Sequence, residues 1–147
     1  MRNRKRGFTL VEILIVVIIL GILAAIVIPQ FTNASNDARN NSVASTLQTV
    51  RSQIELYKIQ HADTPPPAAS MWTQMLNASN TTGTTNATAN TTYPLGPYVQ
   101  AAPLNPANGQ SAVAAAPATT AGWVYTVNGS QYTIQAVDTT GSAVLTY

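Results

Sequence analysis

The sequence predicts an α+β protein, in which a long N-terminal helix packs on a small antiparallel β-sheet. Three observations predict this class. An apolar run extends from Ile13 to Ile28, and apolar residues then recur with helical spacing as far as Tyr57. Near the C-terminus, an Asn-Gly dipeptide lies between two stretches of alternating residues, which predicts a β-hairpin.

The first element is the apolar segment 8–29, which is long enough to cross a membrane as a helix. About 20 helical residues span the roughly 30 Å hydrocarbon layer. Four of the seven basic residues lie just before it, in residues 1–7, and this asymmetry predicts a cytoplasmic N-terminus and an extracytoplasmic C-terminal part. Without residues 1–7, three basic side chains remain against five acidic ones, so the net charge changes from +2 to −2.

Three interpretations of this segment compete. A secretory signal peptide requires small residues at a cut site after the apolar run, but Ala24 and Ala25 are followed by three bulky residues. A permanent signal anchor is never cut. A leader that is cut before the segment leaves the segment in the mature protein.

Glu12 lies inside the segment and bears on this choice. A carboxylate within a membrane segment costs a few kcal/mol on insertion scales, so it is a functional candidate by default. The alternative is that Glu12 lies near the cytoplasmic face and its side chain reaches water.

The sequence from Gly7 to Glu12, GFTLVE, and the apolar sequence that follows it to Gln30 resemble the class III signal of type IV pilins and type II secretion pseudopilins. The resemblance implies a pilin-like fold and cleavage after Gly7 by a prepilin peptidase. It also implies N-methylation of the new terminal Phe8. The Phe8 amine would then pair with Glu12 of a neighbouring subunit.

The charges support this pairing as a hypothesis. Cleavage creates a cation at Phe8, four residues from the anion at Glu12, and both would lie in an apolar filament core. Removing one partner of a buried ion pair typically costs about 3–5 kcal/mol. We therefore expect the pair to fix the axial register of subunits more than to add stability.

The function that the resemblance implies is that of a structural subunit. It would polymerise into a type II secretion pseudopilus that supports protein export. The alternatives are a type IV pilin of a surface pilus (adhesion, motility or DNA uptake) and, from another class, a monomeric membrane-anchored binding domain. The implied partners are further copies in a helical homopolymer, the prepilin peptidase, an inner-membrane assembly platform and minor pilins or pseudopilins. The implied location is the bacterial inner membrane, in a single pass, and then a periplasmic or surface filament.

The second element, 30–64, continues the helix as an amphipathic segment. Its apolar residues recur at spacings of four and three, which places them on one helical face; they are Val43, Leu47, Val50, Ile54 and Tyr57. Pro29 predicts a helix kink or local melting, because proline lacks one hydrogen-bond donor and clashes with the preceding turn. The prolines at 65–67 predict the end of the helix.

The remaining residues, 65–147, predict a small globular β domain. Ser70 is a candidate cap for a short helix that starts at Met71. Residues 77–92 contain only Asn, Ala, Ser, Thr and Gly, which predicts a variable, mobile loop, and chance explains its glycosylation sequons. Residues 93–106 resemble the irregular segment that follows this loop in major pseudopilins.

The hairpin prediction is specific. A two-residue turn at Asn128-Gly129 would place Tyr125 opposite Tyr132 and Trp123 opposite Ile134. These four residues would form the core face of the sheet against the helix. Ala143 to Tyr147 would add a third strand, at an edge of the sheet.

We expect no enzyme activity, because the residues form no catalytic constellation. His61 is the only histidine, there is no cysteine, and the acids are scattered. The absence of cysteine also favours a pseudopilin or a disulfide-free pilin. Major pseudopilins bind calcium through an acid-rich C-terminal loop, but here that region offers only Asp138, so we expect no metal or other cofactor. The sequence contains no basic patch of the kind that would predict nucleic-acid binding.

Overall fold

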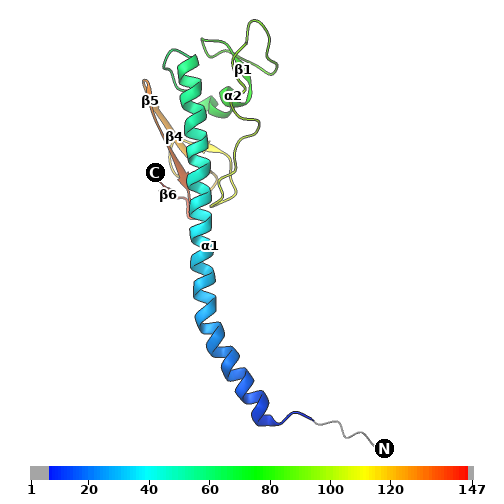
Figure 1. Ribbon diagram of the computed structural model, residues 1–147. Helices are drawn as coiled ribbons and strands as arrows, with labels where there is room; N and C mark the ends of the chain where they lie inside the picture. The colour runs from blue at the N-terminus through cyan, green and yellow to red at the C-terminus, as the bar shows by residue number, and fades with distance from the viewer. Residues whose placement is uncertain (1–6, 146–147) are drawn as a thin grey trace, which may run out of the picture. The chain divides into compact units, whose positions relative to one another are not determined.

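A computed structural model describes residues 7–145 of the chain. It separates into two compact units, Met1–Ala38 and Arg39–Tyr147, and the helix α1, Leu10–Gln60, contributes to both (Figure 1). The predicted leader, apart from Gly7, and the last two residues of the predicted C-terminal strand lie outside the described residues.

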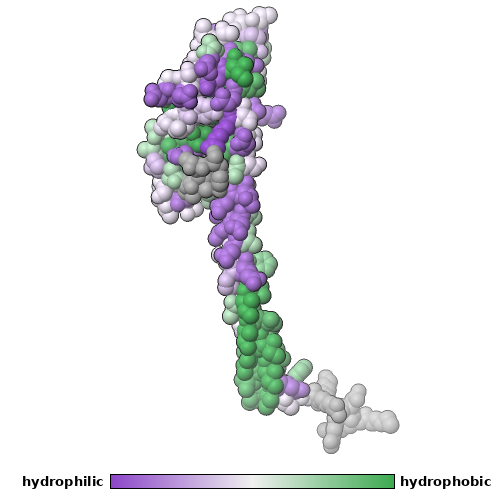
Figure 2. Space-filling model, turned by 60° about the vertical axis from the view of Figure 1, so that its left-hand side comes forward, coloured by the Kyte–Doolittle hydropathy of each residue, from purple (hydrophilic) through white to green (hydrophobic). Residues whose placement is uncertain are grey.

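The first unit consists of the N-terminal part of α1. Its large apolar side chains between Leu10 and Ile28 are 45–81% exposed, and they form the green surface in Figure 2. By length and composition this is a candidate membrane-spanning helix. The helix continues without interruption through Pro29, so the local melting that the proline predicts is not seen, whereas a kink there stays a prediction.

In the second unit, α1 packs on the globular part through the predicted apolar stripe. All five residues of the stripe are at most 2% exposed: Val43, Leu47, Val50, Ile54 and Tyr57. The helix ends at Gln60, close to the expected end. The backbone N–H of Asp63 donates to the carbonyl of Lys58 over 2.9 Å, which satisfies one of the last carbonyls of the helix.

The main sheet has four strands in the order β3-β4-β5-β6. They are β3 (Val113–Ala114), β4 (Trp123–Asn128), β5 (Gln131–Val137) and β6 (Ala143–Leu145). The pairs β4–β5 and β5–β6 are antiparallel, and β6 is the predicted third strand. The short β3 pairs with β4 in parallel, so the sheet is mixed rather than purely antiparallel.

The predicted hairpin register is wrong by two residues. Asn128 pairs with Gln131 and Tyr125 pairs with Ile134, so Gly129 and Ser130 are the central residues of the turn. Gly129 has φ +61°, which suits glycine at the first central position of a type II′ turn. A shift of two residues keeps every side chain on its predicted face.

The core therefore has the predicted composition despite the changed register. Trp123, Tyr125 and Ile134 are buried against α1, and Tyr132 is partly buried beside them. The rings of Tyr125 and Tyr132 still meet, with centroids 5.8 Å apart. A smaller cluster on the opposite face of the sheet contains Ala121, Val124 and Val137.

The segment between α1 and the main sheet is more ordered than its composition predicts. A 3₁₀ turn, Ala68–Ser70, leads into α2, Met71–Leu76, but the Ser70 side chain makes no capping hydrogen bond. Within the predicted mobile loop, β1 (Ala78–Ser79) and β2 (Thr85–Asn86) form a two-stranded antiparallel sheet. The reason is local, because the Asn80 side chain accepts hydrogen bonds from the backbone N–H groups of Thr82 and Thr84.

Candidate functional site

The start of α1 is organised around Glu12. One oxygen of the Glu12 carboxylate, Oε2, accepts hydrogen bonds from the backbone N–H of Thr9 over 2.8 Å and from the Thr9 hydroxyl over 2.7 Å. In return, the Glu12 N–H donates to the Thr9 hydroxyl oxygen over 3.3 Å. This reciprocal arrangement is a capping box, which satisfies donors that the first helical turn leaves free.

The sequence prediction for Glu12 did not include this capping box. Its signal was present, because Thr-x-x-Glu before an apolar run is the motif of a capping box. Glu12 thus defines where α1 begins, and its acid also lies at the positive end of the helix dipole. Within the described residues, its second oxygen, Oε1, has no hydrogen-bond partner and can accept a further donor.

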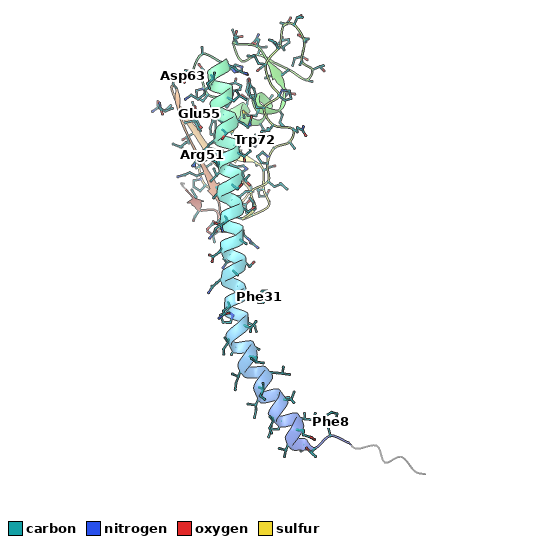
Figure 3. The ribbon with its side chains drawn as sticks, in the orientation of Figure 1. Phe8, Phe31, Arg51, Glu55, Asp63 and Trp72 are labelled. Carbon is teal, nitrogen blue, oxygen red and sulfur yellow. The ribbon has the colours of Figure 1, made fainter. Side chains whose placement is uncertain are left out.

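Gly7 and Phe8 precede this capping box as exposed, non-helical residues, and the Phe8 side chain is 84% exposed (Figure 3). The chain is uncut in this structure, so the nitrogen of Phe8 is a peptide nitrogen and not an amine. The predicted cleavage site therefore lies in an exposed, non-helical segment directly before the helix. Neither residue packs against the rest of the described chain.

The apolar surface of α1 is the second part of the site. From Leu10 to Ile28, apolar side chains are exposed at successive positions all around the helix, and Figure 2 shows one face of this apolar surface. A helix that is apolar on every side is stable only when it is surrounded, by lipid or by other apolar helices. The N-terminal part of α1, residues 10–28, therefore needs to be surrounded by lipid or by apolar helices of other molecules.

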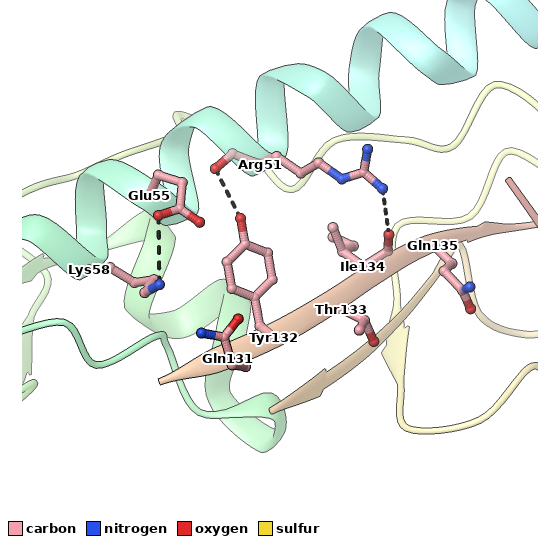
Figure 4. A pocket seen from close by; sticks show the side chains of 8 residues that line it. All are labelled: Arg51, Glu55, Lys58, Gln131, Tyr132, Thr133, Ile134 and Gln135. Atoms are coloured by element: carbon pink, nitrogen blue, oxygen red, sulfur yellow. Dashed lines mark hydrogen bonds and ion pairs between the residues drawn. The ribbon is translucent and has the colours of Figure 1, made fainter. Parts of the chain in front are cut away.

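A polar groove lies in the second unit, between α1 and β5 (Figure 4). The Arg51 guanidinium donates to the carbonyl of Ile134 over 3.2 Å, and the Tyr132 hydroxyl donates to the carbonyl of Arg51 over 3.4 Å. Lys58 lies 3.7 Å from Glu55 and 3.4 Å from Asp63. Burial, followed by the nearby Glu55 carboxylate, raises the pKa of Tyr132. The two hydrogen bonds of Arg51 join the helix to β5, and the two ion pairs of Lys58 stabilise the end of the helix, so the groove has a structural role.

His61 is also structural. It is 3% exposed, and its ring stacks on that of Tyr57 with centroids 3.7 Å apart. Its Nδ1 donates to the carbonyl of Tyr57, since a carbonyl only accepts, and its Nε2 lies 3.0 Å from the Ser79 hydroxyl. His61 thus interacts with a carbonyl near the end of α1 and contacts β1.

Asp138 holds the turn between β5 and β6. Its carboxylate accepts hydrogen bonds from the Thr140 hydroxyl, over 2.7 Å, and from the backbone N–H of Thr140 and of Ser142, each over 2.9 Å. The Thr140 hydroxyl and then the Ser142 N–H hold the pKa of Asp138 below its ordinary value. Among the described residues, no three acids, histidines or cysteines gather as metal ligands would.

The N-terminal segment matches a known family. Residues 2–28 match the family described as the prokaryotic N-terminal methylation motif. The type II secretion system core protein G of Dickeya chrysanthemi is 37% identical over 65 residues, 44% of this chain. That alignment spans 42% of the relative, so the chain matches less than half of its length.

Two further relatives are similar over a larger share of their length. The type II secretion system core protein G of Klebsiella pneumoniae is 30% identical over 104 residues, which cover 71% of this chain and 70% of the relative. The type IV narrow pilus major component PilA5 of Thermus thermophilus is 34% identical over 100 residues, which cover 60% of this chain and 84% of the relative. The comparison with solved structures gives no match.

Proposed function

This chain belongs to the family of type IV pilins and type II secretion pseudopilins, and we propose that it is a structural subunit of a type II secretion pseudopilus, where it supports protein export. One observation carries the proposal: an exposed, non-helical Gly7-Phe8 junction leads directly into a Glu12-capped helix that is apolar on every side. The relatives named core protein G support this choice of machine.

Processing at Gly7 prepares the subunit for assembly. We propose that a prepilin peptidase cuts after Gly7 on the cytoplasmic side and that the new terminal Phe8 is N-methylated. The basic leader orients the precursor and keeps the Phe8 nitrogen in a peptide bond. After the cut, the Phe8 amine is a cation that a carboxylate can neutralise.

Glu12 of a neighbouring subunit supplies that carboxylate. In the single chain, Oε2 of Glu12 is occupied by Thr9 and Oε1 has no partner within the described residues. Oε1 can therefore accept the amine of a neighbour while Oε2 still caps its own helix. The two roles of Glu12 are compatible, and the charge pair sets the axial register of the helices.

The apolar half of α1 has two successive environments in this proposal. It first crosses the inner membrane in a single pass, with the globular unit outside the cytoplasm, and it then enters the core of the filament. The proposed partners are further copies of the chain, the prepilin peptidase, the inner-membrane assembly platform and minor pilins or pseudopilins. We propose neither catalysis nor nucleic-acid binding by this chain.

A surface pilus is the second candidate, since the Thermus relative is named as the major component of a type IV pilus. The cysteine-free sequence is compatible with both filaments. A monomeric anchored domain remains the candidate from another class, and it requires neither cleavage nor a charge pair.

Mass spectrometry of the N-terminus tests the proposal. The chain is expressed in a host that has a prepilin peptidase, and membranes and filaments are analysed separately. We expect a mature chain that begins with methylated Phe8, and an intact Met1 in both fractions would contradict the proposal. Electron microscopy of sheared surface material then separates a long pilus from a periplasmic pseudopilus.

A further inference from the structure

Asn105 is a fully buried polar residue in the irregular segment before β3. Its amide nitrogen, Nδ2, donates to the carbonyl of Gly122 over 2.7 Å and to the carbonyl of Val137 over 2.6 Å. Its amide oxygen, Oδ1, accepts the N–H of Ala107 over 2.8 Å. Every donor and acceptor around this side chain agrees with this orientation of the amide, since the two carbonyls can only accept and the N–H can only donate.

These bonds join three parts of the chain that are distant in sequence. Gly122 directly precedes β4, Val137 ends β5, and Asn105 lies in a tight loop in which its carbonyl accepts the N–H of Gly109 over 2.7 Å. Asn108 adds a parallel tie, because its amide nitrogen donates to the carbonyl of Ala121 over 2.8 Å. The two amides together hold the start of β4 and the end of β5 against the 105–110 loop.

This part of the fold is where the family resemblance implies calcium. Calcium takes six to eight oxygen ligands, usually with several carboxylates. Asp138 is the only acid that follows Asp63 in the sequence, and its carboxylate is engaged by Thr140 and Ser142. The carbonyl of Val137, the residue next to Asp138, is directed to Asn105 instead. The residues present therefore do not fit a calcium ion.

We infer that the side-chain amide of Asn105 takes the structural place of a metal ion in this chain. A cation gathers carbonyl oxygens from separate segments by its charge, and the NH₂ group of Asn105 gathers two such oxygens by hydrogen bonds. The C-terminal region is then held together by a neutral side chain, and its stability does not depend on calcium. This role is independent of which filament the chain forms.

Thermal melting of the full chain in detergent tests the inference directly. The midpoint of unfolding is measured from the near-ultraviolet circular dichroism of the buried aromatic residues, in calcium chloride and in a calcium chelator. We expect the same midpoint in both. A midpoint that calcium raises by several degrees would overturn the inference, and this comparison needs no variant.

Two substitutions test the residue. Asn105→Asp keeps the size of the side chain but replaces the donating NH₂ group by an acceptor, and Asn105→Ala removes both groups. We expect each to lower the midpoint by about 10 °C, with or without calcium, because buried carbonyls lose their donors. Asn86→Ala is the matched control, because Asn86 is exposed and its side chain accepts only the N–H of Thr88; we expect little change.

A midpoint of Asn105→Asp equal to that of the wild type would contradict the inference. If either variant fails to fold, hydrogen exchange of the wild type still decides. The N–H of Ala107 should exchange slowly, because it donates to Asn105. Exchange of that N–H as fast as in an unfolded chain would overturn the proposed contact.

Discussion

At the scale of single residues, the few charged side chains of this protein mostly contact groups that are close in sequence. Glu12 caps the helix whose first turn it belongs to, Asp138 closes the β5–β6 turn, and Lys58 bridges two acids beside the sheet. Each of these groups contacts neighbours within five residues in sequence. Long-range polar ties in the globular unit come from the Arg51 guanidinium, which donates to the carbonyl of Ile134, and from neutral groups. The neutral groups include Asn105 and the Tyr125 hydroxyl, which donates to the carbonyl of Pro66 over 3.0 Å.

The ionised carboxylate of Asp138 should contribute to the stability of the folded protein. Hydrogen bonds from Thr140 and Ser142 lower the pKa of Asp138 in the folded state below its ordinary value of 3.8. A carboxyl group whose pKa is lower in the folded state contributes stability above its unfolded pKa. That contribution is lost as the pH falls through the folded pKa.

The measurement is the unfolding midpoint as a function of pH, from neutral to strongly acidic solution. We expect the wild-type midpoint to fall more steeply below the ordinary pKa of Asp138 than that of Asp138→Asn, which cannot take up this proton. If the midpoints of the two proteins fell equally steeply in acid, these hydrogen bonds would not favour the ionised form of Asp138.

At the scale of elements, the apolar stripe on α1 decides how the helix meets the sheet. Leu47 and Ile54 are fully buried, whereas Ile59, on the same helix, is 79% exposed. The contrast follows from the helical period, because residues three and four apart share a face and Ile59 lies off that face.

Leu47→Ala and Ile59→Ala test this assignment as a matched pair. Truncating a buried leucine typically costs about 2–5 kcal/mol of unfolding free energy, because it removes apolar contacts and leaves a cavity. An exposed side chain usually changes stability by less than about 0.5 kcal/mol. We expect a large drop of the thermal midpoint for Leu47→Ala only. Equal drops would contradict the packing of α1 described above.

The β4–β5 turn makes a second prediction at this scale. With Gly129 and Ser130 at the centre of the turn, only Gly129 needs a positive φ. Gly129→Ala should therefore destabilise the hairpin by about 1–2 kcal/mol, the usual cost of a left-handed non-glycine residue, while Asn128→Ala should have little effect.

Measured midpoints of the two variants distinguish the two registers. A turn centred on Asn128 and Gly129 would require positive φ at both residues. Asn128→Ala would then cost as much as Gly129→Ala, and that result would favour the register predicted from the sequence.

At the scale of the whole molecule, the chain consists of parts with different solvents. Residues 10–28 present apolar side chains all around the helix, whereas residues 39–145 bury a core of their own. Such a helix has to exchange lipid for other apolar helices when a subunit leaves the membrane. We therefore propose that the chain is complete only in an assembly, and that groups at its N-terminus direct this assembly.

Most of this organisation could be predicted from the sequence, because it depends on periodicity. The buried stripe from Val43 to Tyr57 and the core face of the hairpin follow from spacings of three and four or of two. The end of α1 before Pro65 follows from the prolines. The parallel strand of the sheet could not be predicted, because β3 is two residues long and its pairing with β4 depends on tertiary contacts.

The features that could not be predicted depend on single side chains. The two-residue slip of the hairpin follows from a choice between two adjacent glycine turns, Asn-Gly and Gly-Ser, that both fit the sequence. Asn105 looked like one of many loop asparagines, and only the fold shows that it is fully buried between three segments. The Thr9–Glu12 capping box, by contrast, follows from the Thr-x-x-Glu motif before an apolar run.

We propose that the Glu12 charge serves assembly, in addition to the cap that the carboxylate provides. Glu12→Gln separates the two roles, because glutamine keeps the acceptor oxygen of a capping box but removes the charge. Thr9→Ala is the matched control, because it removes the hydroxyl of the capping box but leaves the carboxylate.

The measurement is the amount of subunit in purified filaments, relative to the amount of subunit whose mature N-terminus is Phe8. We predict that Glu12→Gln is processed but incorporated at least tenfold less than the wild type, in the absence of wild-type subunits, whereas Thr9→Ala is incorporated nearly normally. Incorporation of Glu12→Gln at the wild-type level would contradict the account.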